Sequence, residues 1–269
     1  MNVFIIAKSV PEDSTQQYAQ YVRPSGGLIT PFMAKTIERA FKAKVRQNYG
    51  TAELGTIAYD CKDNTNQHLI AEIQYVEFLR YGKPVAPGEL GEIYVTDLRN
   101  RVSPLIRYRV GDVGRAVGNQ CSCGYNGLLF QVEGRLDEII VTPEGKAFTP
   151  SETIDFFLAR PEFSFVKLVQ RSDRKFTVEY VPSAAIAETL DVQLLEKRLS
   201  REFSEFLETS VEVSLRKVRR IPPEGSGKYK LVISKSYDRF HQQISDDKNG
   251  GNSDSHCKPQ TLPYKLHSV

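Results

Sequence analysis

The stretch Glu133-Gly134-Arg135-Leu136-Asp137-Glu138 stands where the hydrophobic pattern of the chain changes. Before it, over residues 50–135, short apolar runs alternate with turn signals such as Pro87-Gly88, which is typical of an all-β subdomain. After it, strand-like runs alternate with longer helical ones. The sequence therefore predicts an α+β protein, with an all-β subdomain followed by a mixed domain, and with early strands at Glu92–Thr96 and Leu105–Val110.

Residues 138–240 are predicted to form a small split βαβ (ferredoxin-like) domain, because the elements follow the order β-α-β-β-α-β. These elements are a hairpin at Glu138–Phe148, a helix from Pro150, strands at Phe165–Arg171 and Lys175–Val181, a helix at Asp191–Thr209 and a strand at Val211–Val218. Residues 241–269 are rich in Asp, Ser, Asn and Gly and have no periodicity, so we expect a disordered tail.

Residues 1–137 are predicted to be the C-terminal part of a larger domain, made of a helix and the β subdomain. Asn2–Ala7 is apolar and is predicted to be a buried strand. A helix is expected from Thr30-Pro31, an N-cap and a first-turn proline, to about Lys44. Its buried stripe is formed by residues four apart, namely Met33, Ile37 and Phe41.

The composition is that of an ordinary globular protein, with 40% hydrophobic and 26% charged residues. A formal charge of +3 is too small to argue for nucleic acid, and a solvated strand end explains the basic run at residues 216–220. No apolar run approaches the ~20 residues that span a bilayer. We therefore expect a cytoplasmic protein without nucleic-acid or membrane partners, whose four cysteines are thiols or metal ligands.

The first candidate binding motif is Tyr49-Gly50-Thr51-Ala52-Glu53, directly after the first helix and a short strand. An aromatic ring, a glycine, a hydroxyl and a carboxylate suit the base, phosphate and metal of a bound nucleotide. A plain Tyr-Gly turn with a capping glutamate explains the same residues, so the motif alone does not decide between a site and a turn.

Two further motifs place charged groups near the change of pattern. Asp112 ends the stretch Pro104-Leu-Ile-Arg-Tyr-Arg-Val-Gly-Asp and could accept both hydroxyls of a ribose, or else form a salt bridge with Arg107 or Arg109. Arg135 could reach ribose or phosphate with its fork of donors. The neighbouring Asp137 could equally be a solvated linker residue or a hinge.

The fourth motif is a glycine loop that presents one lysine, Pro222-Pro-Glu-Gly225-Ser226-Gly227-Lys228-Tyr229. The loop is not a Walker phosphate loop, because that motif needs a glycine where Pro222 stands and Ser or Thr where Tyr229 stands. It is predicted to be flexible.

Together and in this order, the four motifs resemble those of the adenylate-forming superfamily. Ser25-Gly26-Gly27-Leu28-Ile29-Thr30-Pro31 and the stretch ending at Asp112 are similar to the phenylacetate–coenzyme A ligase branch, which includes proteins labelled capsule-biosynthesis-like. The resemblance covers about residues 20–236.

The resemblance implies an enzyme that uses ATP, Mg²⁺ and coenzyme A. In such enzymes a carboxylate attacks the α-phosphate of ATP and expels pyrophosphate, and a thiol then displaces AMP. The implied catalytic residues are Lys228, which would stabilise charge on the phosphates, and Glu53, which would bind Mg²⁺. The implied nucleotide-binding residues are Tyr49 (adenine), Asp112 (ribose), Arg135 (ribose or phosphate), Gly26, Gly27, Gly50, Thr51 and Ala52; Asp137 would be the hinge of the small domain.

Two departures from the family pattern limit this interpretation. Ala52 stands where the family usually has a phosphate-binding threonine. Residues 1–47 contain nothing like the Ser/Thr/Gly-rich loop that holds the terminal phosphates of ATP. We therefore expect the C-terminal part of a ligase for a carboxylic acid, aromatic acids being favoured, with a separate chain as the possible source of the rest. The alternatives are a catalytically incomplete remnant or a partner subunit, and a homodimer is possible.

A candidate zinc site comprises Cys61, His68, Cys121 and Cys123, all in the predicted β subdomain. Three thiolates and one imidazole are a known set of structural zinc ligands. Because Cys-x-Cys is tighter than the usual spacing, two unrelated surface residues and a simple turn also explain the pattern. The resemblance favours zinc, since the phenylacetate–coenzyme A ligase branch often has a Cys…His pair and a Cys-x-Cys-Gly at these places. The metal would be structural.

Overall fold

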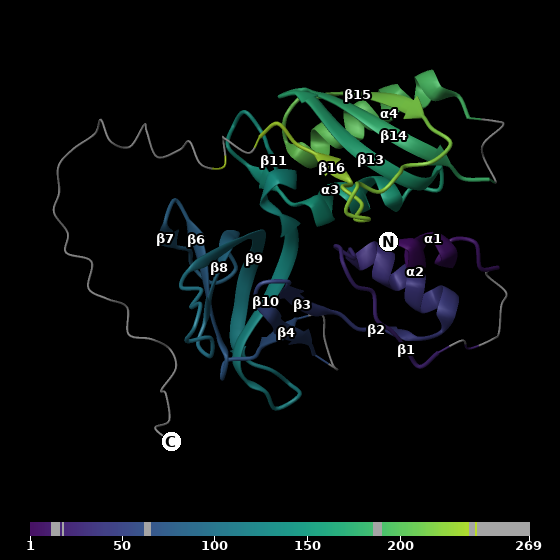
Figure 1. Cartoon of the computed structure of the whole chain (residues 1–269). Coiled ribbons are helices and arrows are strands. Elements are labelled where there is room, and N and C mark those ends of the chain that lie inside the picture. Colours follow the sequence, from purple (N-terminus) through teal and green to yellow (C-terminus); the bar gives the residue numbers. More distant parts are fainter. Residues whose placement is uncertain (12–16, 18, 62–65, 185–189, 237–239, 241–269) are drawn as a thin grey trace, which may run out of the picture.

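The computed structural model describes residues 1–11, 17, 19–61, 66–184, 190–236 and 240, and the predicted disordered tail lies outside them. Its elements form three groups (Figure 1): an eight-stranded sheet, a pair of N-terminal helices with a two-stranded sheet, and a C-terminal group of sheet and helices. None of the helices in these residues is long and apolar enough to cross a membrane.

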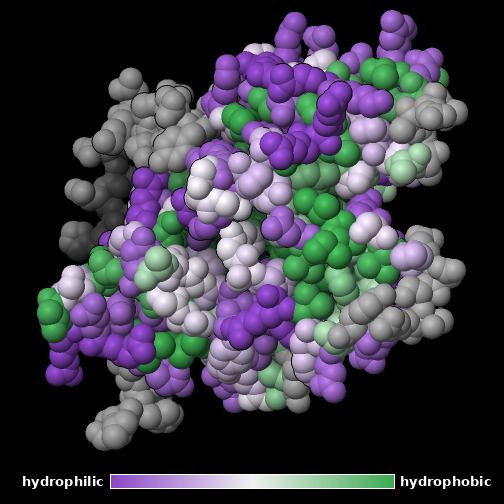
Figure 2. Space-filling model, turned by 45° about the vertical axis from the view of Figure 1, so that its right-hand side comes forward, coloured by the Kyte–Doolittle hydropathy of each residue, from purple (hydrophilic) through white to green (hydrophobic). Residues whose placement is uncertain are grey.

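The N-terminal group contains helices α1 (Asn2–Ala7) and α2 (Pro31–Phe41), with strands β1 (Tyr21–Val22) and β2 (Lys44–Val45) paired in parallel. The prediction of a strand at the start was wrong. Phe4 and Ala7, three residues apart, are buried, whereas Ile5 and Ile6 are 41% and 54% exposed, which is a helical pattern of burial. Figure 2 shows hydrophobic side chains gathered on the face where these helices lie.

Helix α2 begins where the sequence predicts. The Thr30 hydroxyl accepts a hydrogen bond from the backbone N–H of Met33 at 3.2 Å, and Pro31 occupies the first turn. The helix ends at Phe41, three residues earlier than predicted, because Lys42 adopts a left-handed conformation with φ 49°.

The eight-stranded sheet is formed by strands of the section that was predicted to be all-β. Every neighbouring pair is antiparallel. The spatial order is β3 (Asn48–Thr51), β4 (Gly55–Asp60), β5 (Gln67–Leu69), β10 (Asn126–Arg135), β9 (Tyr108–Gln120), β8 (Gly91–Asp97), β6 (Gln74–Arg80), β7 (Lys83–Pro84). Strand β9 starts three residues later than predicted, because Arg107 has a positive φ of 49° that extended backbone does not allow.

The C-terminal group follows the predicted order of helices and strands, after a single turn of helix at Leu136–Glu138. Its four-stranded sheet has the order β15-β14-β13-β16, and β16 was not predicted. The elements are β11 (Ile140–Val141), β12 (Ala147–Phe148), α3 (Pro150–Leu158), β13 (Phe163–Ser172), β14 (Lys175–Pro182), α4 (Val192–Leu207), β15 (Glu212–Lys217) and β16 (Val232–Ile233).

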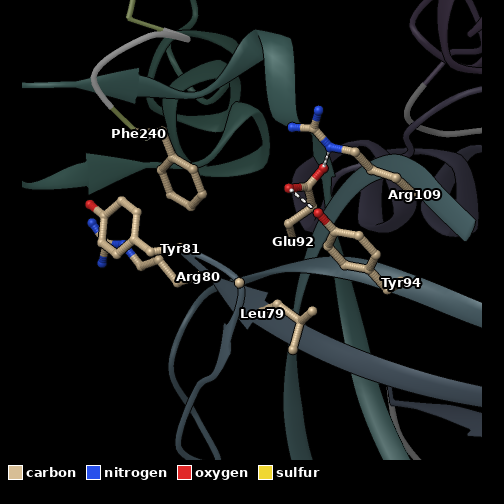
Figure 3. A pocket seen from close by; sticks show the side chains of 8 residues that line it. Leu79, Arg80, Tyr81, Glu92, Tyr94, Arg109 and Phe240 are labelled. Carbon is tan, nitrogen blue, oxygen red and sulfur yellow. Dashed lines mark hydrogen bonds and ion pairs between the residues drawn. The ribbon is translucent and has the colours of Figure 1, made fainter. Parts of the chain in front are cut away.

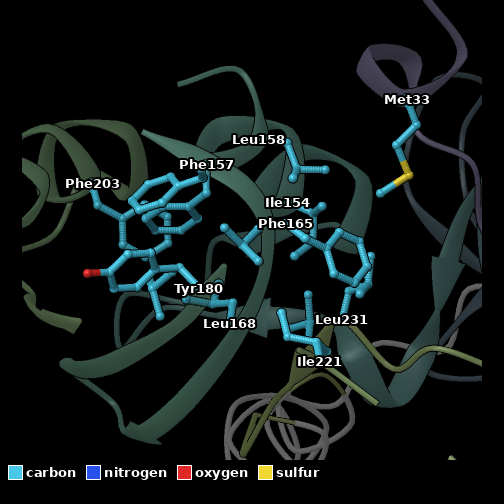
Figure 4. Close-up of a cluster of buried hydrophobic side chains, with 14 of the residues drawn as sticks. Met33, Ile154, Phe157, Leu158, Phe165, Leu168, Tyr180, Phe203, Ile221 and Leu231 are labelled. Carbon is cyan, nitrogen blue, oxygen red and sulfur yellow. The ribbon is translucent and has the colours of Figure 1, made fainter. Parts of the chain in front are cut away.

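The largest core joins the N-terminal group to the C-terminal group, and not to the eight-stranded sheet. Phe4, Met33 and Ile37 pack into the same cluster as Phe157 and Leu168 (Figure 4). A buried polar contact adds to this interface, because the Asp155 carboxylate accepts hydrogen bonds from the Thr30 hydroxyl and the Phe32 N–H. Residues on both sides of Asp137 therefore share one core, while the eight-stranded sheet has its own, centred on Ile57, Ile93 and Phe130.

Candidate functional site

Asp112 lies at the centre of the candidate nucleotide site. Its carboxylate accepts a hydrogen bond from the Tyr49 hydroxyl at 2.9 Å and one from Arg135 at 3.1 Å. The register of β9 and β10 sets this second contact, because Asp112 and Arg135 are directly opposed. Gly111 has φ 74°, and a Cβ there would meet the Arg135 guanidinium at 3.0 Å, so glycine allows the close approach.

The alternative salt bridges of Asp112 do not form. Arg107 pairs with Glu77 at 3.0 Å, and Arg109 pairs with the buried Glu92. Their acidic partners belong to β6 and β8, on the side of β9 away from β10. The hydrogen-bond donors to the Asp112 carboxylate are therefore Tyr49 and Arg135.

Burial governs the protonation of this pair. It raises the pKa of the Tyr49 phenol well above its ordinary value, and the Asp112 charge raises it further. Burial also raises the pKa of Asp112, although Arg135 and the Tyr49 hydrogen bond oppose that shift. The Tyr49 ring is 8% exposed and lies edge-on to Phe130, with centroids 6.0 Å apart. Tyr49 is thus fixed as a donor to Asp112, and its role against adenine stays a prediction.

Glu53 and Lys228 come from distant parts of the sequence, and the charge of Lys228 acts on the Glu53 carboxylate. The pKa of Glu53 is lowered first by its own backbone N–H, then by the hydroxyls of Thr51 and Tyr108, and also by the charge of Lys228. Lys228 lowers the pKa of Asp112 as well. The charge of Lys228 therefore acts on one carboxylate of each of the first two motifs.

The rest of the first motif serves the turn between β3 and β4. The Thr51 hydroxyl accepts a hydrogen bond from the Leu54 N–H at 3.2 Å, and a Cβ on Gly50 would approach the Gly55 carbonyl oxygen to 2.2 Å. Ala52 lies exposed in that turn, and Gly26 and Gly27 lie in the turn before α2. Phosphate contacts from these residues stay predictions.

Two charged residues near the proposed hinge, Lys230 and Glu138, were not predicted from the sequence as site residues. Lys230 forms an ion pair with Asp137, whose carboxylate also lies 3.9 Å from the Arg135 Nε. The next residue, Glu138, has a pKa raised to about 8, first by burial and then by the charge of Asp137. Of the two, only Lys230 could have been suspected from the sequence, because it lies two residues after Lys228.

The four predicted zinc ligands meet in one cluster. Cys61 follows β4, His68 lies on β5, and Cys121 and Cys123 belong to the turn between β9 and β10. Their ligand atoms all lie within 4.8 Å of one another. The Sγ atoms of Cys61 and Cys121 are 3.3 Å apart, and the Sγ of Cys123 is 3.8 Å from the Nε2 of His68.

These separations fit a tetrahedral zinc ion. With Zn–S bonds of about 2.3 Å, ligand atoms at the corners of a tetrahedron are about 3.8 Å apart. The His68 ring is held by two tyrosines, stacked on Tyr125 at 4.2 Å and edge-on to Tyr59 at 5.3 Å. Hydrogen bonds from the Cys123 backbone and from His68 lower the pKa of Cys121 to about 6, which favours the thiolate that binds metal.

No family model matches this chain. Its sequence is 20% identical over 228 residues to the phenylacetate–coenzyme A ligase of Thermus thermophilus. That match covers 76% of this chain and 51% of the ligase, so the chain spans about half the length of the curated relative that it matches.

Solved structures of acyl–coenzyme A ligases have the same fold. A 2-hydroxyisobutyryl–coenzyme A ligase, in the postadenylation state with an acyl-AMP, has a TM-score of 0.67 at 18% identity, covering 84% of this chain and 51% of that one. An anthranilate–coenzyme A ligase bound to anthranoyl-AMP has a TM-score of 0.60 at 14% identity, with coverages of 84% and 46%.

The fold is therefore that of one part of the acyl–coenzyme A ligases. The sequence match and the shared fold together relate this chain to the adenylate-forming superfamily, over about half the length of such ligases.

Proposed function

We propose that this chain is the nucleotide-binding and lid part of an ATP-dependent carboxylate–coenzyme A ligase, which forms an acyl-adenylate and then a thioester. The observation that carries the proposal is the convergence on Asp112 of Tyr49, Arg135 and the charge of Lys228. Three separate motifs of the sequence meet at this one carboxylate. The comparisons support the reaction class, because the similar ligases hold acyl-AMP in their structures.

Each residue has a role that its contacts suit. Asp112, fixed by two donors, would accept the ribose hydroxyls, and Arg135 would contact ribose or phosphate. Glu53 is exposed and has a lowered pKa, so it would stay ionised to bind Mg²⁺. Lys228 would stabilise negative charge as it develops on the α-phosphate and pyrophosphate, an effect commonly worth about 10²–10³ in rate.

The zinc cluster would have a structural role. It would join the loop after β4, which follows the Tyr49 strand, to the turn between β9 and β10. Four protein ligands leave no open position for a substrate, as in structural zinc sites. The proposed substrates, ATP, coenzyme A and a carboxylic acid, aromatic acids being favoured, would be met in the cytoplasm, where thiols stay reduced.

A second candidate function follows from the half-length match. The chain would then be a partner subunit or a remnant that keeps the nucleotide-site residues without turnover of its own. Within the given sequence, residues 1–47 carry no Ser/Thr/Gly-rich loop for the terminal phosphates of ATP.

Carboxylate-dependent exchange of pyrophosphate into ATP tests the proposal. It is measured with the full chain alone and together with the product of any adjoining reading frame that encodes the phosphate loop. We expect exchange in the combined sample, lost in Lys228→Gln and kept in Lys217→Gln, which alters an exposed lysine of β15. No exchange in either sample would refute the enzyme and leave the second candidate.

A further inference from the structure

Phe240 packs on both sides of the proposed hinge. Phe240 is 1% exposed and belongs to a small hydrophobic cluster that is separate from the two larger cores. Two members of that cluster, Leu90 and Val113, lie next to and within the eight-stranded sheet, while Ile139 and Val141 follow Asp137. Phe240 therefore bridges the two parts of the chain that the hinge connects.

A second contact ties Phe240 to the far edge of the sheet. The guanidinium carbon of Arg80, at the end of β6, lies 5.0 Å from the centroid of the Phe240 ring, a cation–π geometry. Phe240 also lines a pocket of about 220 Å³ against Tyr81, Glu92 and Tyr94 (Figure 3). The ring thus closes over the β6–β7 turn, which belongs to the sheet and not to the C-terminal group.

Ser234 and Ser236 are bound to the other side of the hinge, the C-terminal group. The Ser236 hydroxyl donates to the Val141 carbonyl oxygen at 3.2 Å and to the Gln170 side-chain oxygen at 2.8 Å. The Ser234 hydroxyl donates to the Ile139 carbonyl oxygen. These bonds hold Ser234 and Ser236 against the start of β11 and against β13, whereas Phe240 contacts the eight-stranded sheet through Arg80 and Val113.

We propose that Ser234, Ser236 and Phe240 form a latch across the hinge, with Phe240 as the positioning residue that keeps the C-terminal group where Lys228 faces Asp112. This inference rests on the proposed function for the meaning of that arrangement. Rotation about Asp137 would carry Ile139 and Val141 away from Leu90 and Arg80, so Phe240 would have to leave one of its two partners. Its apolar and cation–π contacts oppose that motion in addition to the core that the N-terminal and C-terminal groups share.

Hydrogen–deuterium exchange of the full chain tests the latch without ATP or turnover. In Phe240→Ala we expect exchange in peptides over residues 78–94 and 136–141 to be at least about tenfold faster, since a buried aromatic ring is lost. Peptides over α4, which packs one face into the C-terminal core through Leu195, Leu199 and Phe203, should not change. Phe240→Leu should restore slow exchange, and Val102→Ala, an apolar change at a residue that is 97% exposed, should have no effect.

Two outcomes overturn the latch. One is unchanged exchange at both sites in Phe240→Ala, and the other is an equal increase over α4, which means that Phe240 serves general stability. Hydrogen–deuterium exchange needs no nucleotide, so it tests the latch separately from the enzyme. If the Phe240 variants behave as expected but no pyrophosphate exchange is found, the proposed enzyme is refuted and the latch is not.

Discussion

Removing one ligand of the proposed zinc site should destabilise the protein by the free energy that zinc binding adds to the folded state. Cys121→Ser removes one of the four ligands, and it lies outside the strands, in the turn between β9 and β10. The four ligand atoms lie within 4.8 Å of one another, so a single ion can reach all of them. The contribution of zinc is therefore set by how far its free concentration exceeds the dissociation constant, and a thousandfold excess gives about 4 kcal/mol.

This free energy converts into a measurable shift of melting temperature. For a chain of this size, 1 kcal/mol changes Tm by about 2–4 °C, so Cys121→Ser or a chelator should lower Tm by about 8–16 °C. The assay is thermal unfolding followed by circular dichroism, with the zinc content of the same samples measured by mass spectrometry.

The matched control is Cys257→Ser, which changes the one cysteine outside the cluster. It should keep one zinc ion per chain and the wild-type Tm. Purified protein without stoichiometric zinc, whose melting neither chelator nor Cys121→Ser alters, would show that the four residues are not a metal site.

Three further changes test other parts of the structure. Tyr49→Phe removes a hydrogen bond to the Asp112 carboxylate, so urea unfolding should show a loss of about 1.5–3 kcal/mol, and a loss below about 0.5 kcal/mol would contradict the contact. Because the pKa of Glu138 is raised to about 8 in the folded state, its protonated form adds stability that is lost as pH rises from about 4.5 to 8. In Glu138→Gln the Tm should fall less over this pH range than in the wild type. Equal falls of Tm in the two proteins would contradict the raised pKa of Glu138. Phe157→Ala, at a ring that is 0% exposed, should cost about 3–5 kcal/mol of unfolding free energy, and a near-neutral result would disprove the shared core.

The regular elements could be predicted where the local pattern has one solution. Thr30-Pro31 and Thr149-Pro150 start helices because a threonine N-cap and a first-turn proline act within one turn. The run at Asn2–Ala7 is too short for periodicity to separate strand from helix, and packing on α2 decides in favour of a helix.

The members of the site could be predicted better than their pairing. Cysteine and histidine are rare in this chain, so the zinc candidates followed from residue type. The choice of Arg135 over Arg107 as the partner of Asp112 depends on the register of β9 and β10, which no local pattern specifies. The same holds for Lys230 and Phe240, whose partners come from the far side of the hinge.

Calorimetric titration of AMP into the full chain tests most directly whether Asp112 is the centre of an AMP site. We predict saturable binding that Asp112→Asn weakens about tenfold or more, since the change removes a charged acceptor while keeping its shape. Circular dichroism of the variant should stay that of the wild type. No saturable binding by the wild type, or equal affinity of folded Asp112→Asn, would contradict the nucleotide site.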